Sequence, residues 1–240
     1  MPKPALAILT LALVLTGPAF ADETTLAAGA GFRRPLSELA QVYSAQSGHD
    51  ILQIYGHVGQ VLAQARESDE IALVCGDKAV MANAEGIEFD RWIPLGTGKL
   101  VVAFRKGVAL EGARDVADPA LQRIGIPDQA AAIYGRAGRQ FLERSGLAGA
   151  VEDRLVPVAT VPQVTSYVAS GEVDAGFVNA TDAIGAGDGI GGFVAVPADL
   201  YDPVEVACGI RADAGGDALA GFTAYLETPQ ARTILDRYGL

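Results

Sequence analysis

The chain has 240 residues, of which half are hydrophobic and only 20% are charged, so it predicts a packed globular protein rather than a disordered one. Its 29 acidic residues against 18 basic ones give a net charge of −11, which argues against a nucleic-acid-binding protein. This length allows one large domain or two small ones.

The first 21 residues have the pattern of a secretory signal. Lys3 supplies the positive charge, and residues 5–15 form an apolar run that is too short to span a bilayer. An A-x-A cleavage motif follows at residues 19–21, before two acidic residues. We therefore expect removal of residues 1–21 and export to the periplasm. No cysteine follows the signal, so a lipid anchor is not expected.

Beyond this segment, strand patterns alternate with helix patterns. The first strands are expected over 25–28, 51–55, 71–75 and 100–104, and the first helices over 36–47, 58–66 and 78–84. The next strands are expected over 123–126, 155–158, 175–178 and 193–196, and the next helices over 130–145, 161–170 and from 181. The chain ends with a strand over 204–210 and helices over 217–226 and 229–238. This alternation predicts an α/β fold with two groups of βαβ units and mostly parallel sheets.

Two cysteines, Cys75 and Cys208, both lie in apolar stretches that read as strands. Either they are two buried thiols or they form a disulfide, which export would permit. With no cluster of histidines beside them they make a poor zinc site, and we expect no metal and no cofactor.

Four loops that lead from a strand into a helix are candidates for ligand binding, over 29–33, 56–60, 127–135 and 160–163. Helix starts present unpaired N–H groups and the positive end of a dipole, which together suit an anion. Glycines in the first two loops let the backbone approach a ligand closely, although each could serve a turn alone.

Four stretches resemble the periplasmic molybdate-binding proteins, a branch of the type II solute-binding proteins of ABC importers. LAAGAGFRRPLSELAQVYSAQSGHDI resembles the opening strand, ligand loop and first helix of that family, and WIPLGTGKLVVAFRKG its crossover strand between lobes. The two most specific stretches are RLVPVATVPQVTSYVASGEVDAGFVNATDA, in the second lobe, and the C-terminal YLETPQARTILDRYGL.

The resemblance implies two α/β lobes joined by a two-strand hinge, with a small anionic ligand in the cleft between them. The first lobe would comprise 22–103 plus 200–240, and the second 104–199. Such a protein would act as a monomer that delivers a tetrahedral oxyanion, such as molybdate or tungstate, to an ABC importer permease in the inner membrane.

The resemblance also indicates which residues would meet the ligand, and several of them depart from the family. Gly31 stands where the family has a serine, His57 and Val58 where it has serines, and Asn179 where it has a tyrosine. The backbone donor near Val161 is kept. The full set of expected ligand contacts is Gly31, Phe32, Arg33, His57, Val58, Tyr134, Val161 and Asn179.

Three alternatives remain beside the oxyanion receptor. His57, Asn179 and the arginines at 33 and 34 would also suit an organic acid or a phosphonate on the same scaffold. A sensor or adhesin would look the same in sequence. A thiol hydrolase would need Cys75 beside His49 or His57, but a cysteine within an apolar strand is hidden, and we expect no enzyme.

Overall fold

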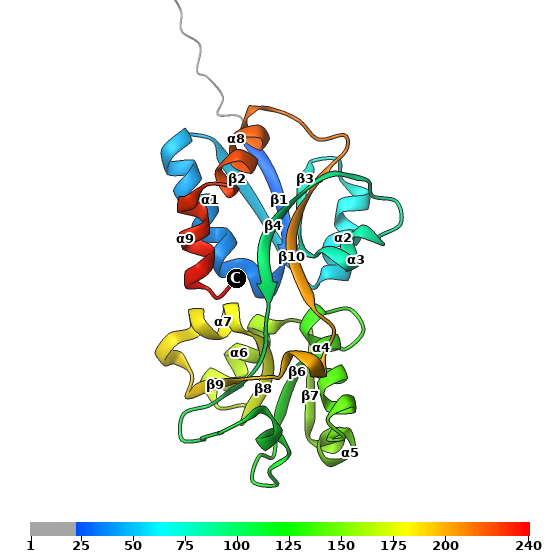
Figure 1. Cartoon of the computed structure of the whole chain (residues 1–240), viewed down its shortest axis with the longest axis vertical. Helices are drawn as coiled ribbons and strands as arrows, with labels where there is room; N and C mark the ends of the chain where they lie inside the picture. The colour runs from blue at the N-terminus through cyan, green and yellow to red at the C-terminus, as the bar shows by residue number, and fades with distance from the viewer. Residues whose placement is uncertain (1–22) are drawn as a thin grey trace, which may run out of the picture.

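The computed structural model describes residues 23–240, so the predicted signal at 1–21 lies outside the described residues. Two lobes lie end to end along the long axis of the molecule, and each is built on a five-stranded sheet (Figure 1). The α/β two-lobed fold predicted from the sequence is therefore confirmed. No helix within residues 23–240 has both the length and the apolar character needed to cross a membrane.

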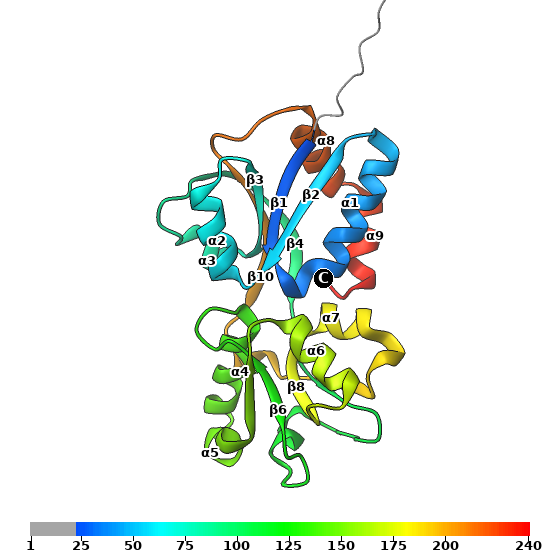
Figure 2. The same ribbon diagram turned by 180° about the vertical axis from the view of Figure 1, so that it is seen from behind.

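The first lobe holds the sheet with strand order β2-β1-β3-β10-β4. Its strands are β1 (Glu23–Gly29), β2 (Asp50–Gly56), β3 (Ile71–Asp77), β4 (Phe89–Gly98) and β10 (Val204–Arg211). Its helices are α1 (Arg33–Ser47), α2 (Val58–Glu67), α3 (Lys78–Ala82), α8 (Asp217–Leu226) and α9 (Pro229–Arg237), and a 3-10 turn, η1 (Ala30–Phe32), precedes α1. Helices α2 and α3 cover one face, and α1, α8 and α9 cover the other (Figures 1 and 2).

The second lobe holds the sheet with strand order β7-β6-β8-β5-β9. Its strands are β5 (Leu100–Phe104), β6 (Ile124–Pro127), β7 (Leu155–Val158), β8 (Ala175–Asn179) and β9 (Gly192–Ala195). Its helices are α4 (Ile133–Arg144), α5 (Ala148–Val151), α6 (Val161–Ser170) and α7 (Ala180–Ala186), with 3-10 turns η2 (Ala113–Ala117), η3 (Glu152–Arg154), η4 (Gly187–Gly189) and η5 (Ala198–Leu200).

The two sheets share one pattern of strand directions. In the first sheet β10 runs antiparallel to both neighbours while the other strands share one direction, and in the second sheet β5 does the same. The three parallel strands in each sheet end at the side that faces the other lobe (Figure 1). Ligands in open α/β sheets bind beyond the carboxyl ends of such strands.

Two chain segments cross between the lobes. The first crosses at Lys99, between β4 and β5, and the second runs from β9 through η5 to β10 (Figure 1). The boundary expected after residue 103 falls too late, because the backbone of β5 pairs with β8 and β9 in the second sheet. The N–H of Leu100 also donates to the hydroxyl of Tyr201 at 3.2 Å, which ties the two crossing segments together.

Cys75 and Cys208 form a disulfide, which decides between the two alternatives left by the sequence. The two cysteines lie directly opposite each other on antiparallel strands β3 and β10, with Cα atoms 4.0 Å apart, and both are fully buried. The bond joins positions 133 residues apart, so it fixes the strand that returns from the second lobe to the centre of the first.

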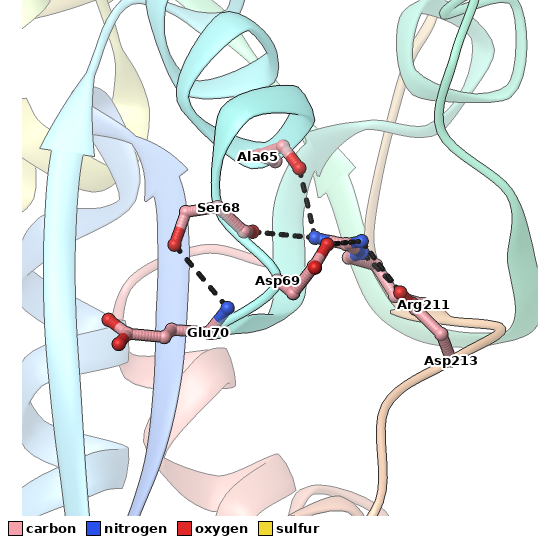
Figure 3. A network of polar contacts seen from close by, with 6 residues as sticks. All are labelled: Ala65, Ser68, Asp69, Glu70, Arg211 and Asp213. Atoms are coloured by element: carbon pink, nitrogen blue, oxygen red, sulfur yellow. Dashed lines mark hydrogen bonds and ion pairs between the residues drawn. The ribbon is translucent and has the colours of Figure 1, made fainter.

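A second attachment holds the far end of β10 to the first lobe (Figure 3). The guanidinium of Arg211 donates to the carbonyls of Ala65 and Ser68 at 2.9 and 2.7 Å, where α2 ends and its carbonyls lack helical partners. Asp69 and Asp213 pair with the same guanidinium. The end of α2 is thereby capped by a residue from the last quarter of the chain.

Candidate functional site

The four loops expected to bind ligand meet in one pocket between the lobes. Two of them follow β1 and β2 of the first lobe, and two follow β6 and β7 of the second. The lining residues are Gly29, Ala30, Gly31, Phe32, Gly56, His57, Val58, Ala132, Ile133, Tyr134, Thr160 and Val161. Of the eight expected contacts, Gly31, Phe32, His57, Val58, Tyr134 and Val161 lie in this lining, whereas Arg33 and Asn179 do not.

Each loop brings the start of a helix to the pocket. The first loop forms the 3-10 turn η1, which leads into α1, and the other three loops lead into α2, α4 and α6. The residues before α2, α4 and α6 are extended, as is usual for an N-cap, so the first N–H groups of each helix lack helical acceptors. Helix starts also carry a partial positive charge. The four starts therefore surround the pocket with fixed N–H donors and a favourable potential for an anion.

No side chain that lines the pocket is an aspartate, glutamate, lysine or arginine. The lining is made of small, apolar and aromatic residues, and His57, Tyr134 and Thr160 are its residues with polar side-chain groups. An anion held here would owe its binding to backbone dipoles rather than to an ion pair. Among residues 23–240, no group of three or more histidine, cysteine, aspartate or glutamate residues could hold a metal ion.

The pocket is small with the lobes as they stand. Its free volume is about 20 Å³. One water molecule needs roughly 10–15 Å³ of such free volume, so the pocket admits a compact ion and excludes a sugar or a peptide.

His57 caps its own helix. Its Nδ1 accepts a hydrogen bond from the N–H of Gln60 at 3.0 Å, which satisfies one of the first donors of α2. That bond requires an unprotonated Nδ1, so the ring keeps its proton on Nε2, and only this N–H remains for a ligand. On the second-lobe side of the pocket, hydrogen bonds from the N–H groups of Ala131 and Ala130 lower the pKa of the Asp128 carboxyl.

Phe32 and Tyr134 form an aromatic contact across the cleft. Their ring centroids lie 6.0 Å apart in an edge-to-face arrangement, and both side chains are buried. The Tyr134 hydroxyl makes no hydrogen bond of normal geometry among the described residues. Burial raises its pKa far above the ordinary value, and the nearby Asn179 side chain opposes this with a smaller effect. This hydroxyl lies against Gly98, where an added Cβ would stand 2.1 Å from it.

Asn179 lies beneath the first loop rather than in the pocket lining. It is fully buried, its Nδ2 donates to the carbonyl of Gly31 at 2.8 Å across the two lobes, and its Oδ1 has no partner among the described residues. A Cβ on residue 31 would stand only 3.0 Å from that oxygen, so Asn179 occupies the space that a serine at 31 would need. The small residue at 31 and the amide at 179 therefore depend on each other.

Arg33, one of the expected contacts, does not line the pocket. Its guanidinium lies 5.8 Å from the centre of the Tyr55 ring. Arg34, the neighbouring candidate, pairs with Asp182 of the second lobe. Neither guanidinium therefore belongs to the pocket lining, and each has a partner outside it.

Thr160 lines the pocket but was not among the eight contacts expected from the sequence, although its loop was. Its hydroxyl makes no capping bond to α6, so it stands at the pocket as a free side-chain donor among the described residues. The signal was present, since a threonine directly before Val161-Pro162 is a typical N-cap residue, and an N-cap hydroxyl that does not cap is free for a ligand.

Comparisons with known proteins agree with this geometry. A family model described as "Bacterial extracellular solute-binding protein" matches residues 24–240. Molybdate-binding protein ModA of Rhodobacter capsulatus is 26% identical over 237 residues, which cover 96% of this chain and 93% of the relative. ModA of Azotobacter vinelandii is 26% identical over 233 residues, covering 94% and 92%.

The fold agrees with a solved structure as well. The periplasmic molybdate-binding protein of Azotobacter vinelandii superposes with a TM-score of 0.81 at 26% identity, and the match covers 90% of this chain and 97% of that one. These relatives are binding proteins rather than enzymes, and among the described residues of this chain no free cysteine remains to act as a nucleophile. The chain belongs to the bacterial extracellular solute-binding protein family.

Proposed function

We propose that this chain is the periplasmic binding component of an ABC importer and that it carries a compact tetrahedral oxyanion, molybdate or tungstate, between its lobes. The observation that supports this most is the convergence of four helix starts on one small pocket without charged side chains. Two relatives that are 26% identical over nearly the whole chain are named molybdate-binding proteins.

The chemistry of the pocket favours an anion that has lost its water. Fixed N–H donors replace the hydration shell at little reorganisation cost, and each bond to a charged ligand contributes about 1.5–3 kcal/mol. The serines and tyrosine of the family are absent, so the backbone, the Thr160 hydroxyl and the His57 Nε2–H carry the binding. The ligand is then handed to an inner-membrane permease by a monomer that residues 1–21 direct to the periplasm.

The organic-acid alternative loses part of its support. It rested on His57, Asn179 and the arginines at 33 and 34, and of these only His57 lies in the pocket lining. The small free volume also favours an ion over a larger organic anion.

Thermal unfolding of the exported form, refolded to remove bound ligand, tests the proposal. The panel holds molybdate, tungstate, sulfate, phosphate, phosphonates and small carboxylates. A ligand at 100 times its Kd adds about 2.7 kcal/mol, which raises Tm by roughly 5–10 °C at this size. A shift with molybdate and tungstate supports the proposal, and a shift only with an organic anion, or none at all, contradicts it.

A further inference from the structure

An ion pair joins the two lobes beside the pocket. Nε of Arg34, in the first turn of α1, donates to Oδ1 of Asp182, in the first turn of α7, at 3.0 Å. Helix α1 belongs to the first lobe and α7 to the second, so any rotation that parts the lobes must break this bond. Asp182 follows Asn179 by three residues, and the Asn179–Gly31 bond crosses the same boundary.

The acid partner is built into the second lobe. The Asp182 side chain is only 3% exposed, and its other oxygen accepts the hydroxyl proton of Thr165 at 2.5 Å. Thr165 lies on α6, the helix that presents Val161 to the pocket, and its hydroxyl also lies 3.3 Å from the Val161 carbonyl. Asp182 is thus held in place by the same helix that lines the ligand site.

The basic partner, Arg34, reaches from the first lobe and packs against a helix of the second lobe. A Cβ at Gly185 of α7 would stand 2.0 Å from Cδ of Arg34, so the arginine stem lies flat on the helix where a side chain is absent. The Arg34 side chain remains 42% exposed and borders a cavity of about 400 Å³ that Arg33, Ser37 and Pro162 also line. Water therefore reaches the pair, and the pair can open without disturbing either core.

We propose that Arg34 and Asp182 form a closure latch that keeps the lobes shut over the bound ligand and slows its release. The latch rests on the proposed function, since it acts on the ligand of that pocket. The pair exists only while the lobes are together, so it stabilises the closed state alone. A ligand that binds the closed state gains residence time from it, and both residues are positioning residues that never touch the ligand.

Release kinetics test the latch, with molybdate as the probe and rapid filtration after dilution as the measurement. Arg34→Gln and Asp182→Asn should each raise the release rate by about 10-fold, because truncating one partner of a hydrogen-bonded charge pair acts mainly on dissociation. The double variant should release no faster than either single one. Gly185→Ala should act like Arg34→Gln while leaving every charge in place.

Arg33→Gln is the matched control, since it removes the same charge from the same helix turn outside the latch, and it should change the release rate less than twofold. Equal release rates in wild type, Arg34→Gln and Gly185→Ala would overturn the latch. If wild type fails to bind any oxyanion, the proposed function fails, and the radius of gyration by small-angle X-ray scattering decides the latch separately. A larger radius for Arg34→Gln than for Arg33→Gln and wild type then supports it, and equal radii overturn it.

Discussion

Two buried polar atoms beneath the ligand pocket lack partners among the described residues, the hydroxyl of Tyr134 and Oδ1 of Asn179. A buried polar group without a hydrogen bond costs about 1–3 kcal/mol, so each needs a reason to persist. Both lie where the two lobes meet, since the Asn179 side chain contacts Gly31 and the Tyr134 hydroxyl lies against Gly98. Polar groups are thus kept at the boundary although the described residues offer them no hydrogen bond.

Tyr134→Phe separates a structural role of this hydroxyl from a role in binding. Because the hydroxyl is buried and unpaired, removing it should leave the free energy of unfolding without ligand unchanged or raise it by up to about 1 kcal/mol. Urea unfolding measures this, and Tyr134→Leu serves as a control for loss of the ring. A clear loss of stability in Tyr134→Phe would show that the hydroxyl is satisfied after all.

For single residues, the sequence predicted which of them lie in the pocket better than it predicted what their side chains contact. The glycine, valine and aromatic contacts at 31, 32, 58, 134 and 161 fall in the pocket lining because each is fixed by the end of a strand or the start of a helix. The roles of His57, Arg33 and Asn179 depend on side-chain torsions and on neighbours from the other lobe. Residue type alone did not reveal that His57 caps α2 or that Asn179 supports Gly31.

Among the elements, the starts of the helices supply the backbone N–H donors proposed to bind the ligand. Substitution by proline removes one such N–H group at a time. Val161 is the first residue of α6, and Thr160 before it is extended, which a following proline requires. Val161→Pro should therefore keep the helix and remove one N–H, weakening oxyanion binding by about 1.5–3 kcal/mol, or roughly 10- to 150-fold in Kd.

Val161→Ala is the control for this variant, because it removes the side chain and keeps the N–H. Isothermal titration with molybdate should give near wild-type affinity for Val161→Ala and the loss for Val161→Pro alone. Equal losses in the two variants would mean that packing, and not the backbone donor, sets the affinity.

The disulfide between β3 and β10 should contribute to stability through the unfolded chain. Closing a loop of this length restricts the unfolded state, and loss of such a bond typically costs about 2–4 kcal/mol. The Cys75→Ala/Cys208→Ala variant should show that loss in chemical unfolding while still binding ligand.

In the wild-type protein, the two cysteines should react with a thiol label in the presence of a reductant only after denaturant is added, because both are fully buried. Rapid labelling of the folded protein would contradict this.

Asp174 should make the second lobe sensitive to acid. Burial alone would raise the pKa of this carboxyl, but the hydrogen bonds from Arg105 and from the N–H groups of Arg123 and Gln122 outweigh it and lower the pKa. A lowered pKa in the folded state adds stability that is complete above the ordinary value of about 3.9 and is lost as pH falls through the lowered value.

Asp174→Asn should consequently cost about 1–3 kcal/mol at pH 7, and the difference in stability between variant and wild type should shrink as pH falls through the lowered pKa of Asp174. Urea unfolding at a series of pH values measures the gap. A gap that stays constant with pH would show that the charge of Asp174 does not stabilise the lobe.

Most strands and helices could be predicted from the sequence, because their apolar spacing and glycine stops are local signals. Helix α1 ends at Gly48 and α6 at Gly171, both in the left-handed conformation, as their position after a helix pattern indicated. Strand β4 was not predicted as an element, because Pro94 and two glycines interrupt its pattern. It lies at the edge of its sheet, where a proline is tolerated, and edge position is not visible in a sequence.

For the whole molecule, the alternation of strands and helices predicted an α/β fold with two groups of βαβ units, and the resemblance predicted two lobes with a cleft between them. The residue at which the chain passes from the first lobe to the second could not be predicted, because the pattern of Leu100–Phe104 is that of a strand in either sheet. The disulfide also stayed undecided, since it depends on β3 and β10 lying side by side although they are far apart in the sequence. Contacts between distant segments are what local patterns leave open.

If the backbone at four helix starts holds a compact oxyanion between the lobes, crystals grown with tungstate will show it, because anomalous scattering locates the metal without any assumption about the site. We expect one strong peak within hydrogen-bonding reach of the N–H groups of residues 31, 58, 134 and 161, with Arg33 away from it. A peak elsewhere, or none in crystals grown at saturating tungstate, would contradict it.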